Sequence, residues 1–283
     1  NDNDNNNSSN NKHLRAQRRL VVNGKDARIQ DWPFAVLLVT CDLGASCIAA
    51  LSSDAAVAES CGCNRFCTGS LVTPGAVLTA AHCLFDTNDR SFLIHAADKT
   101  FAVLNSTTLE GATKANFYGA KSAANAGWSN QFQSYDNDIA LMFLEGCARK
   151  ERDQARVLIG TSDVFGGGAE CTNITALGWG RNSTHVAQFY PLGAYPPLQS
   201  HQTFIHGNDV CQASTVQASK MLSDIFTWGS SASDVKLIGT ERANWNQSPD
   251  RNLCYGGTGA AGLCSGDSGG PAVARLNSSH WVQ

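Results

Sequence analysis

The chain carries the hexapeptide GDSGGP at residues 266–271 and, far upstream, the pentapeptide TAAHC at residues 79–83. A serine between glycines is often only a turn, and an Ala-Ala-His-Cys run is often the end of a buried strand. Together they supply a hydroxyl, Ser268, and a base, His82, which a serine needs because its hydroxyl is a poor nucleophile at neutral pH. An acid, Asp138, lies between them and opens an apolar run.

The order of the three residue types along the chain, His then Asp then Ser, is typical of one kind of catalytic triad. In such a triad His82 takes the proton of Ser268 and returns it to the leaving amine, while a buried Asp138 fixes the imidazole tautomer. The glycines let the backbone N–H groups of Gly266 and Ser268 point into one small space, where they can hold an oxyanion. We therefore predict acyl-transfer chemistry that uses no cofactor and no metal.

Four further motifs accompany these residues: VVNG at 21–24, WPF at 32–34, CTGSL at 67–71 and GWG at 178–180. With the triad motifs, they make the chain resemble the trypsin/chymotrypsin-type serine proteases from Val21 to its last residue. The resemblance implies an all-β, chymotrypsin-like fold of two antiparallel β-barrels with the active site between them. Short apolar runs bounded by Gly, Pro, Asn or Asp, without long helical periodicity, agree with buried strands.

The resemblance also divides the chain. We expect a protease domain at 21–283, with a first barrel at about 21–145 that carries the histidine and the aspartate, and a second at about 165–283 that carries the serine. Residues 1–20 are rich in Asn, Asp and Ser and then basic, which predicts a disordered leader or propeptide. Beyond residue 271 the sequence suffices for about one β-hairpin, whereas the family continues further. We therefore expect a truncated C-terminus and an incomplete second barrel.

Bulk properties indicate a secreted protein. A net charge of −3 argues against a nucleic-acid partner or a membrane-surface role, and no apolar run reaches the ~18 residues of a membrane helix. Eleven cysteines indicate an oxidising compartment. Glycosylation sequons at Asn105, Asn173, Asn182 and Asn277 fit a secreted glycoprotein. The partners implied are protein or peptide substrates and protein inhibitors of proteases.

The sequence predicts the disulfide pairing of only some of the cysteines. The resemblance implies the disulfides Cys67–Cys83, beside the catalytic histidine, and Cys211–Cys254, behind the substrate cleft. A loop at about 41–66 holds four more cysteines, and these are more typical of disulfides that fix an insertion than of a zinc site. The pairing of the remaining cysteines stays open: Cys41, Cys47, Cys61, Cys63, Cys147, Cys171 and Cys264.

Specificity and activation follow from the resemblance. Gly262, six residues before the nucleophile, stands at the base of the primary pocket, where trypsin-like enzymes hold an aspartate. Without that carboxylate a buried substrate cation would be unpaired, and Leu263 should make the pocket shallower, so we expect cleavage after uncharged, apolar residues. Asp267 is expected to pair with the new α-amino group of Val21 after cleavage following Leu20, which makes the chain a zymogen.

Two functions are compatible with the sequence. The first is a secreted serine endopeptidase that forms an acyl-enzyme intermediate on Ser268. The second is a catalytically silent homologue that binds other proteins as a decoy or inhibitor. The intact triad and Gly266 favour the enzyme, because degenerate relatives usually lose at least one of these groups.

Overall fold

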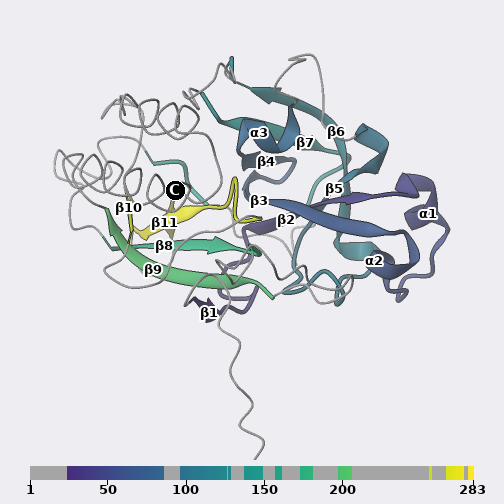
Figure 1. The fold of residues 1–283 in the computed structure, drawn as a ribbon, viewed down its shortest axis with the longest axis horizontal. Coiled ribbons are helices and arrows are strands. Elements are labelled where there is room, and N and C mark those ends of the chain that lie inside the picture. Colours follow the sequence, from purple (N-terminus) through teal and green to yellow (C-terminus); the bar gives the residue numbers. More distant parts are fainter. Residues whose placement is uncertain are drawn as a thin grey trace, which may run out of the picture.

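The computed structural model describes ten segments of the chain, and their strands form two antiparallel sheets, one of which closes into a barrel (Figure 1). The fold is mostly β, which confirms the predicted fold class. The segments are residues 24–85, 96–125, 127–128, 137–148, 157–160, 173–180, 197–205, 255–256, 266–276 and 280–283.

Six strands close the first barrel in the order β2-β3-β4-β7-β6-β5. Strand β2 is the run AVLLVTC, and all but one of its side chains are buried. Its β-branched and leucine side chains suit a pleated surface packed against a core. The strands are β2 (Ala35–Cys41), β3 (Cys63–Thr73), β4 (Ala76–Thr79), β5 (Thr100–Val103), β6 (Phe117–Asn125) and β7 (Ala140–Leu144).

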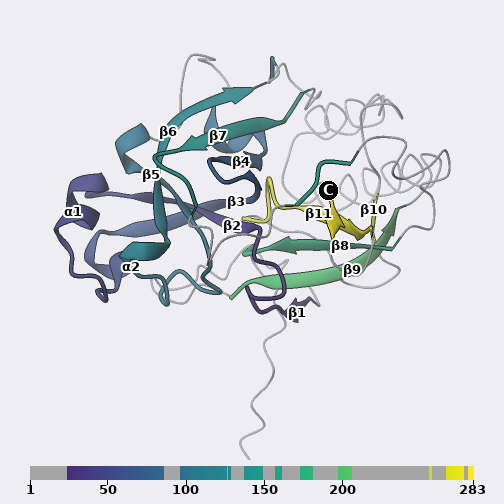
Figure 2. The ribbon, with the colours of Figure 1, turned by 180° about the vertical axis from the view of Figure 1, so that it is seen from behind.

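The remaining strands form a second sheet, which is open over the described residues (Figure 2). Its strands follow the order β1-β9-β8-β11-β12, with β10 paired to β9. The predicted domain boundaries, the leader at 1–20 and the truncation are not tested and stay predictions. The strands are β1 (Lys25–Asp26), β8 (Asn173–Gly178), β9 (Gln199–Ile205), β10 (Tyr255–Gly256), β11 (Ala272–Arg275) and β12 (Trp281–Val282).

One hydrophobic core runs through both sheets. The same cluster of buried residues contains Phe34 and Leu71, at the first barrel, and Leu177 and Trp179, at the second sheet. Trp179 is almost fully buried, and its indole Nε1 donates a hydrogen bond of 2.8 Å to the carbonyl of Thr107. Because the sheets share this core, the strand ends at their junction are held in fixed places relative to one another.

The connection between β2 and β3 is an insertion with two short helices, α1 (Gly44–Ala50) and α2 (Val57–Ser60). Both views place these helices at the end of the first barrel that lies away from the second sheet (Figures 1 and 2). Nested disulfides, Cys41–Cys63 and Cys47–Cys61, fix the insertion. The ammonium of Lys114 donates to two carbonyls at the C-terminal end of α1, at 2.6 and 3.3 Å.

The remaining helices are short. Within the described segments, none of the helices is long and apolar enough to cross a membrane. They are α3 (Ala81–Leu84) and the 3-10 helices η1 (Ala97–Lys99) and η2 (Lys114–Asn116).

Candidate active site

The antiparallel pairing of β4 with β7 brings His82 and Asp138 together. Thr79, the last residue of β4, is paired with Ala140, the first residue of β7. His82 follows the end of β4 in the helix α3, and Asp138 precedes the start of β7. In an antiparallel pair the end of one strand lies beside the start of the other, so two residues 56 positions apart in the sequence meet at one edge of the barrel.

Both oxygens of the Asp138 carboxylate hold His82. Nδ1 of the imidazole lies 2.7 Å from Oδ2, and the backbone N–H of His82 donates to Oδ1 at 2.8 Å. The two side chains are 34% and 19% exposed, so the pair is partly shielded from water while the imidazole stays accessible. A carboxylate at Nδ1 keeps the proton on that nitrogen, so Nε2 is the ring nitrogen that can accept a proton.

Asp138 is ionised at neutral pH. Burial by itself raises the pKa of its carboxyl, because desolvation disfavours the charged form. Hydrogen bonds from the imidazole and the backbone N–H of His82, the charge of the imidazole and a hydrogen bond from the backbone of Ala81 outweigh this effect. The pKa of Asp138 therefore lies below its ordinary value.

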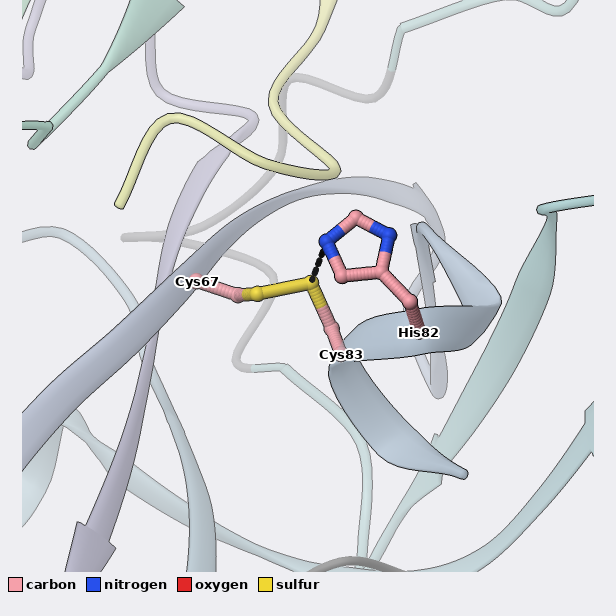
Figure 3. Close-up of side chains that lie close together, drawn as sticks. All are labelled: Cys67, His82 and Cys83. Carbon is pink, nitrogen blue, oxygen red and sulfur yellow. Dashed lines mark hydrogen bonds between the residues drawn. A yellow bond between two sulfur atoms is a disulfide. The ribbon is translucent and has the colours of Figure 1, made fainter. Parts of the chain in front are cut away.

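A disulfide packs against the histidine. Cys67 of β3 is joined to Cys83 of α3, and Nε2 of His82 lies 3.8 Å from the Cys83 sulfur (Figure 3). Of the described residues, these three form a group close enough to hold a metal ion. Both sulfurs are consumed by the disulfide, however, and a thiolate is what a metal would need from cysteine. The disulfide therefore serves to anchor α3 to β3.

The loop that carries Ser268 lies against the same elements. The backbone N–H of Thr68 in β3 donates to the carbonyl of Ser268 at 2.9 Å, and the Cys83 sulfur lies 3.6 Å from that oxygen. Figure 3 shows the C-terminal segment in yellow close to the imidazole ring of His82. The structure thus brings all three predicted triad residues to the junction of the two sheets.

Two glycines give this loop its shape. Gly266 has a φ of +101° and Gly269 a φ of +76°, a region that side chains with a Cβ rarely adopt. A Cβ on Gly269 would also overlap the hydroxyl of Thr79 and lie 2.6 Å from the carbonyl of Thr68. The loop can approach the first barrel this closely only because position 269 has no side chain.

Asp267 is the buried residue of the loop, with 3% of its surface exposed. Its Oδ1 accepts a hydrogen bond of 2.6 Å from the backbone N–H of Gly180. A Cβ on Gly178 would lie 2.9 Å from the carboxylate carbon, and a Cβ on Gly180 would overlap it. The GWG motif therefore supplies two glycines that make room for Asp267 around the buried Trp179, a role that the sequence motif alone did not reveal.

Several residues predicted from the sequence lie outside the described segments. They include the new amino terminus Val21, the pocket residues Gly262 and Leu263, and the disulfide Cys211–Cys254. Among the described cysteines, Cys147 is exposed and takes part in no disulfide.

A closed antiparallel barrel next to a second antiparallel sheet, with a His–Asp pair and a serine loop at their junction, defines the chymotrypsin-like class of folds. The family model described as Trypsin matches residues 21–280, and the chain belongs to this family. A protein named "Trypsin" from Saccharopolyspora erythraea is 24% identical over 254 residues, which cover 89% of this chain and 81% of that protein.

Proposed function

We propose that this chain is a serine endopeptidase that hydrolyses peptide bonds through an acyl-enzyme intermediate on Ser268. The observation that carries the proposal is the 2.7 Å contact between Nδ1 of His82 and the Asp138 carboxylate. It leaves Nε2 as the base on an element, α3, against which the Ser268 loop packs. Membership of the trypsin family supports peptides as the substrate class.

In the proposed mechanism the hydroxyl oxygen of Ser268 attacks the scissile carbonyl while Nε2 of His82 accepts the hydroxyl proton. The backbone N–H groups of Gly266 and Ser268 hold the resulting oxyanion. The imidazolium, stabilised by the Asp138 carboxylate, then gives its proton to the leaving amine, and an ester on Ser268 remains. A water molecule then attacks the ester while His82 accepts one of its protons. The imidazolium returns that proton to the Ser268 oxygen as the ester bond breaks, and the carboxylic acid product leaves.

The same proposal includes a substrate preference and a compartment. In the proposal Gly262 and Leu263 belong to the primary pocket and supply no carboxylate there, so we expect the preferred residue before the scissile bond to be uncharged and apolar. Three disulfides join described cysteines, and disulfides persist in oxidising compartments. Together with the sequons, they support a secreted glycoprotein.

Active-site labelling combined with a peptide panel tests this function. We expect a fluorophosphonate to label Ser268, and chromogenic peptides with Leu, Phe or Ala before the scissile bond to be cleaved faster than one with Arg. Absence of both labelling and cleavage would favour the silent homologue that acts as a decoy or inhibitor. Labelling with Arg as the best substrate would contradict only the proposed pocket.

Activation follows from the burial of Asp267. In the proposal the α-amino group of Val21, released by cleavage after Leu20, forms an ion pair with this buried carboxylate. The pairing orders the loop that holds Gly266 and Ser268. One additional residue would move the amine by about 3.3–3.6 Å along the chain, too far to keep the pair.

Two fusions, in which a site-specific protease releases either Val21 or Leu20 as the first residue, test this activation. The form that begins at Leu20 is expected to lose on the order of 10²-fold or more in kcat/KM, because breaking a buried ion pair costs about 3–5 kcal/mol. Amino-terminal sequencing of each preparation provides the control. Equal activity of the two forms would exclude the Val21–Asp267 pair.

A further inference from the structure

Thr68 connects three separate parts of the candidate site. It lies in β3 next to the Cys67–Cys83 disulfide and is fully buried. Its hydroxyl donates to the carbonyl of Gly266 at 2.9 Å and accepts from the backbone N–H of Trp179 at 3.4 Å. Its backbone N–H donates to the carbonyl of Ser268 at 2.9 Å. A single residue of the first barrel therefore holds both the residue that follows β8 and the serine loop.

These hydrogen bonds hold the loop on both sides of the peptide group between Asp267 and Ser268. The N–H of Ser268 belongs to the peptide between Asp267 and Ser268. The carbonyl of Gly266 belongs to the preceding peptide, and the carbonyl of Ser268 belongs to the following one. Because each peptide is a rigid plane, fixing the two flanking carbonyls restricts the rotations that would turn the N–H of Ser268 away.

The loop needs hydrogen bonds from other segments of the protein to keep one conformation. Gly266 and Gly269 have wide conformational freedom because neither carries a Cβ, and both adopt positive φ values. Stabilisation of an oxyanion depends on donors that already point at it before the reaction. A loop that spends part of its time with these donors turned away is active only in the remaining fraction.

We propose that the hydroxyl of Thr68 is a positioning group that keeps the backbone donors of Gly266 and Ser268 aligned for the oxyanion. This inference rests on the proposed peptidase function. Without the hydroxyl, the carbonyl of Gly266 and the N–H of Trp179 lose a shared partner, while the bond from the Thr68 backbone to Ser268 remains. The serine is therefore still present and still held, but the donors are less well ordered.

The test compares Thr68→Val with Thr68→Ser. Valine keeps the branched shape and the backbone N–H but removes the hydroxyl, whereas serine keeps the hydroxyl. Per active site counted with a burst titrant, Thr68→Val is expected to lower kcat roughly tenfold to hundredfold, less than the 10²–10³-fold caused by complete loss of one donor. KM should change less than about threefold, and Thr68→Ser should stay within about threefold of wild type in kcat.

A transition-state analogue separates positioning from a purely structural role. A peptide boronic acid, whose adduct places an oxygen in the oxyanion hole, should bind Thr68→Val more weakly by the same factor as the loss in kcat/KM. A purely structural role would lower the melting temperature and the titratable fraction while leaving kcat per titrated site and boronate affinity unchanged. That result would overturn the proposal.

Thr68→Ala provides a second variant without the hydroxyl if valine does not fit. A tenfold to hundredfold loss in kcat per titrated site for Thr68→Ala, the loss expected for Thr68→Val, would support the proposal. Failure of both variants to fold, beside a normal Thr68→Ser, would assign the hydroxyl to folding and overturn it. An inactive, unlabelled wild type would refute the peptidase function itself, whereas an active wild type with unchanged Thr68→Val kinetics would refute this inference alone.

Discussion

Replacement of Ser268 with alanine is expected to lower kcat on the order of 10⁶-fold, because loss of the nucleophile in a serine protease leaves only the catalysis provided by binding and the oxyanion hole. The hydrogen bond from Thr68 to this residue ends on the carbonyl oxygen of Ser268, which alanine keeps. The variant should therefore fold normally and resist labelling by a fluorophosphonate. Steady-state kinetics, labelling and thermal unfolding of the same preparation measure the three quantities.

Ser46→Ala is a matched control for this substitution. Ser46 lies in α1, and its exposed hydroxyl donates only to the nearby carbonyl of Leu43, at 3.3 Å. The helix belongs to the insertion at the far end of the first barrel. Ser46→Ala should keep wild-type kcat and labelling. Undiminished peptidase activity in Ser268→Ala would show that Ser268 is not the nucleophile.

The fold class could be predicted because the triad motifs are short, ordered along the chain and tied to one architecture. The hydrogen-bond register that joins His82 to Asp138 could not be predicted. It depends on how Thr79 pairs with Ala140 across the barrel, and the sequence does not encode that pairing locally. The order of residue types thus identified the candidate site, while the strand register supplied its geometry.

The insertion shows a second limit of prediction. Four cysteines in one loop indicate disulfides, but four cysteines allow three pairings, and only the structure distinguishes Cys41–Cys63 with Cys47–Cys61 from the others. The helices α1 and α2 span seven and four residues. Segments this short cannot display the 3.6-residue period that would predict a helix.

The role of Thr68 could not be predicted from the sequence, for a different reason. A threonine inside an apolar stretch is typical of an ordinary β-strand, and the CTGSL motif drew attention to its cysteine. The partners of the Thr68 hydroxyl, Gly266 and Trp179, are far away in the sequence. Such a role emerges only when the three segments are placed together.

Asp138→Asn is expected to lower kcat about 10⁴-fold at neutral pH, the size of effect known for this substitution in triads of this type. The geometry gives the reason. The backbone N–H of His82 points at Oδ1, so the amide oxygen of asparagine takes that place and its NH₂ group faces Nδ1. The NH₂ donates to Nδ1, which moves the imidazole proton to Nε2. The nitrogen that should accept the Ser268 proton then has no free lone pair.

Asp31→Asn is the matched control, because Asp31 is half exposed and pairs with an exposed arginine, Arg28, at 2.9 Å. Such surface pairs contribute about 0–1 kcal/mol, so kcat should not change. A kcat for Asp138→Asn within tenfold of wild type at pH 7 would contradict the assigned role of Asp138.

The pH dependence of stability gives an independent check on Asp138. Its pKa in the folded chain lies below its ordinary value, which is about 3.9 in an unfolded chain. The folded state therefore binds this proton less readily than the unfolded state does. The resulting stabilisation is fully present above about pH 3.9 and disappears as the pH falls through the folded pKa.

Asparagine cannot titrate. The difference in unfolding free energy between wild type and Asp138→Asn, measured by denaturant titration, should therefore shrink as the pH is lowered below about 3.9. A difference that stays constant from pH 7 to the acid limit of folding would show that the ionised carboxylate is not what stabilises this pair.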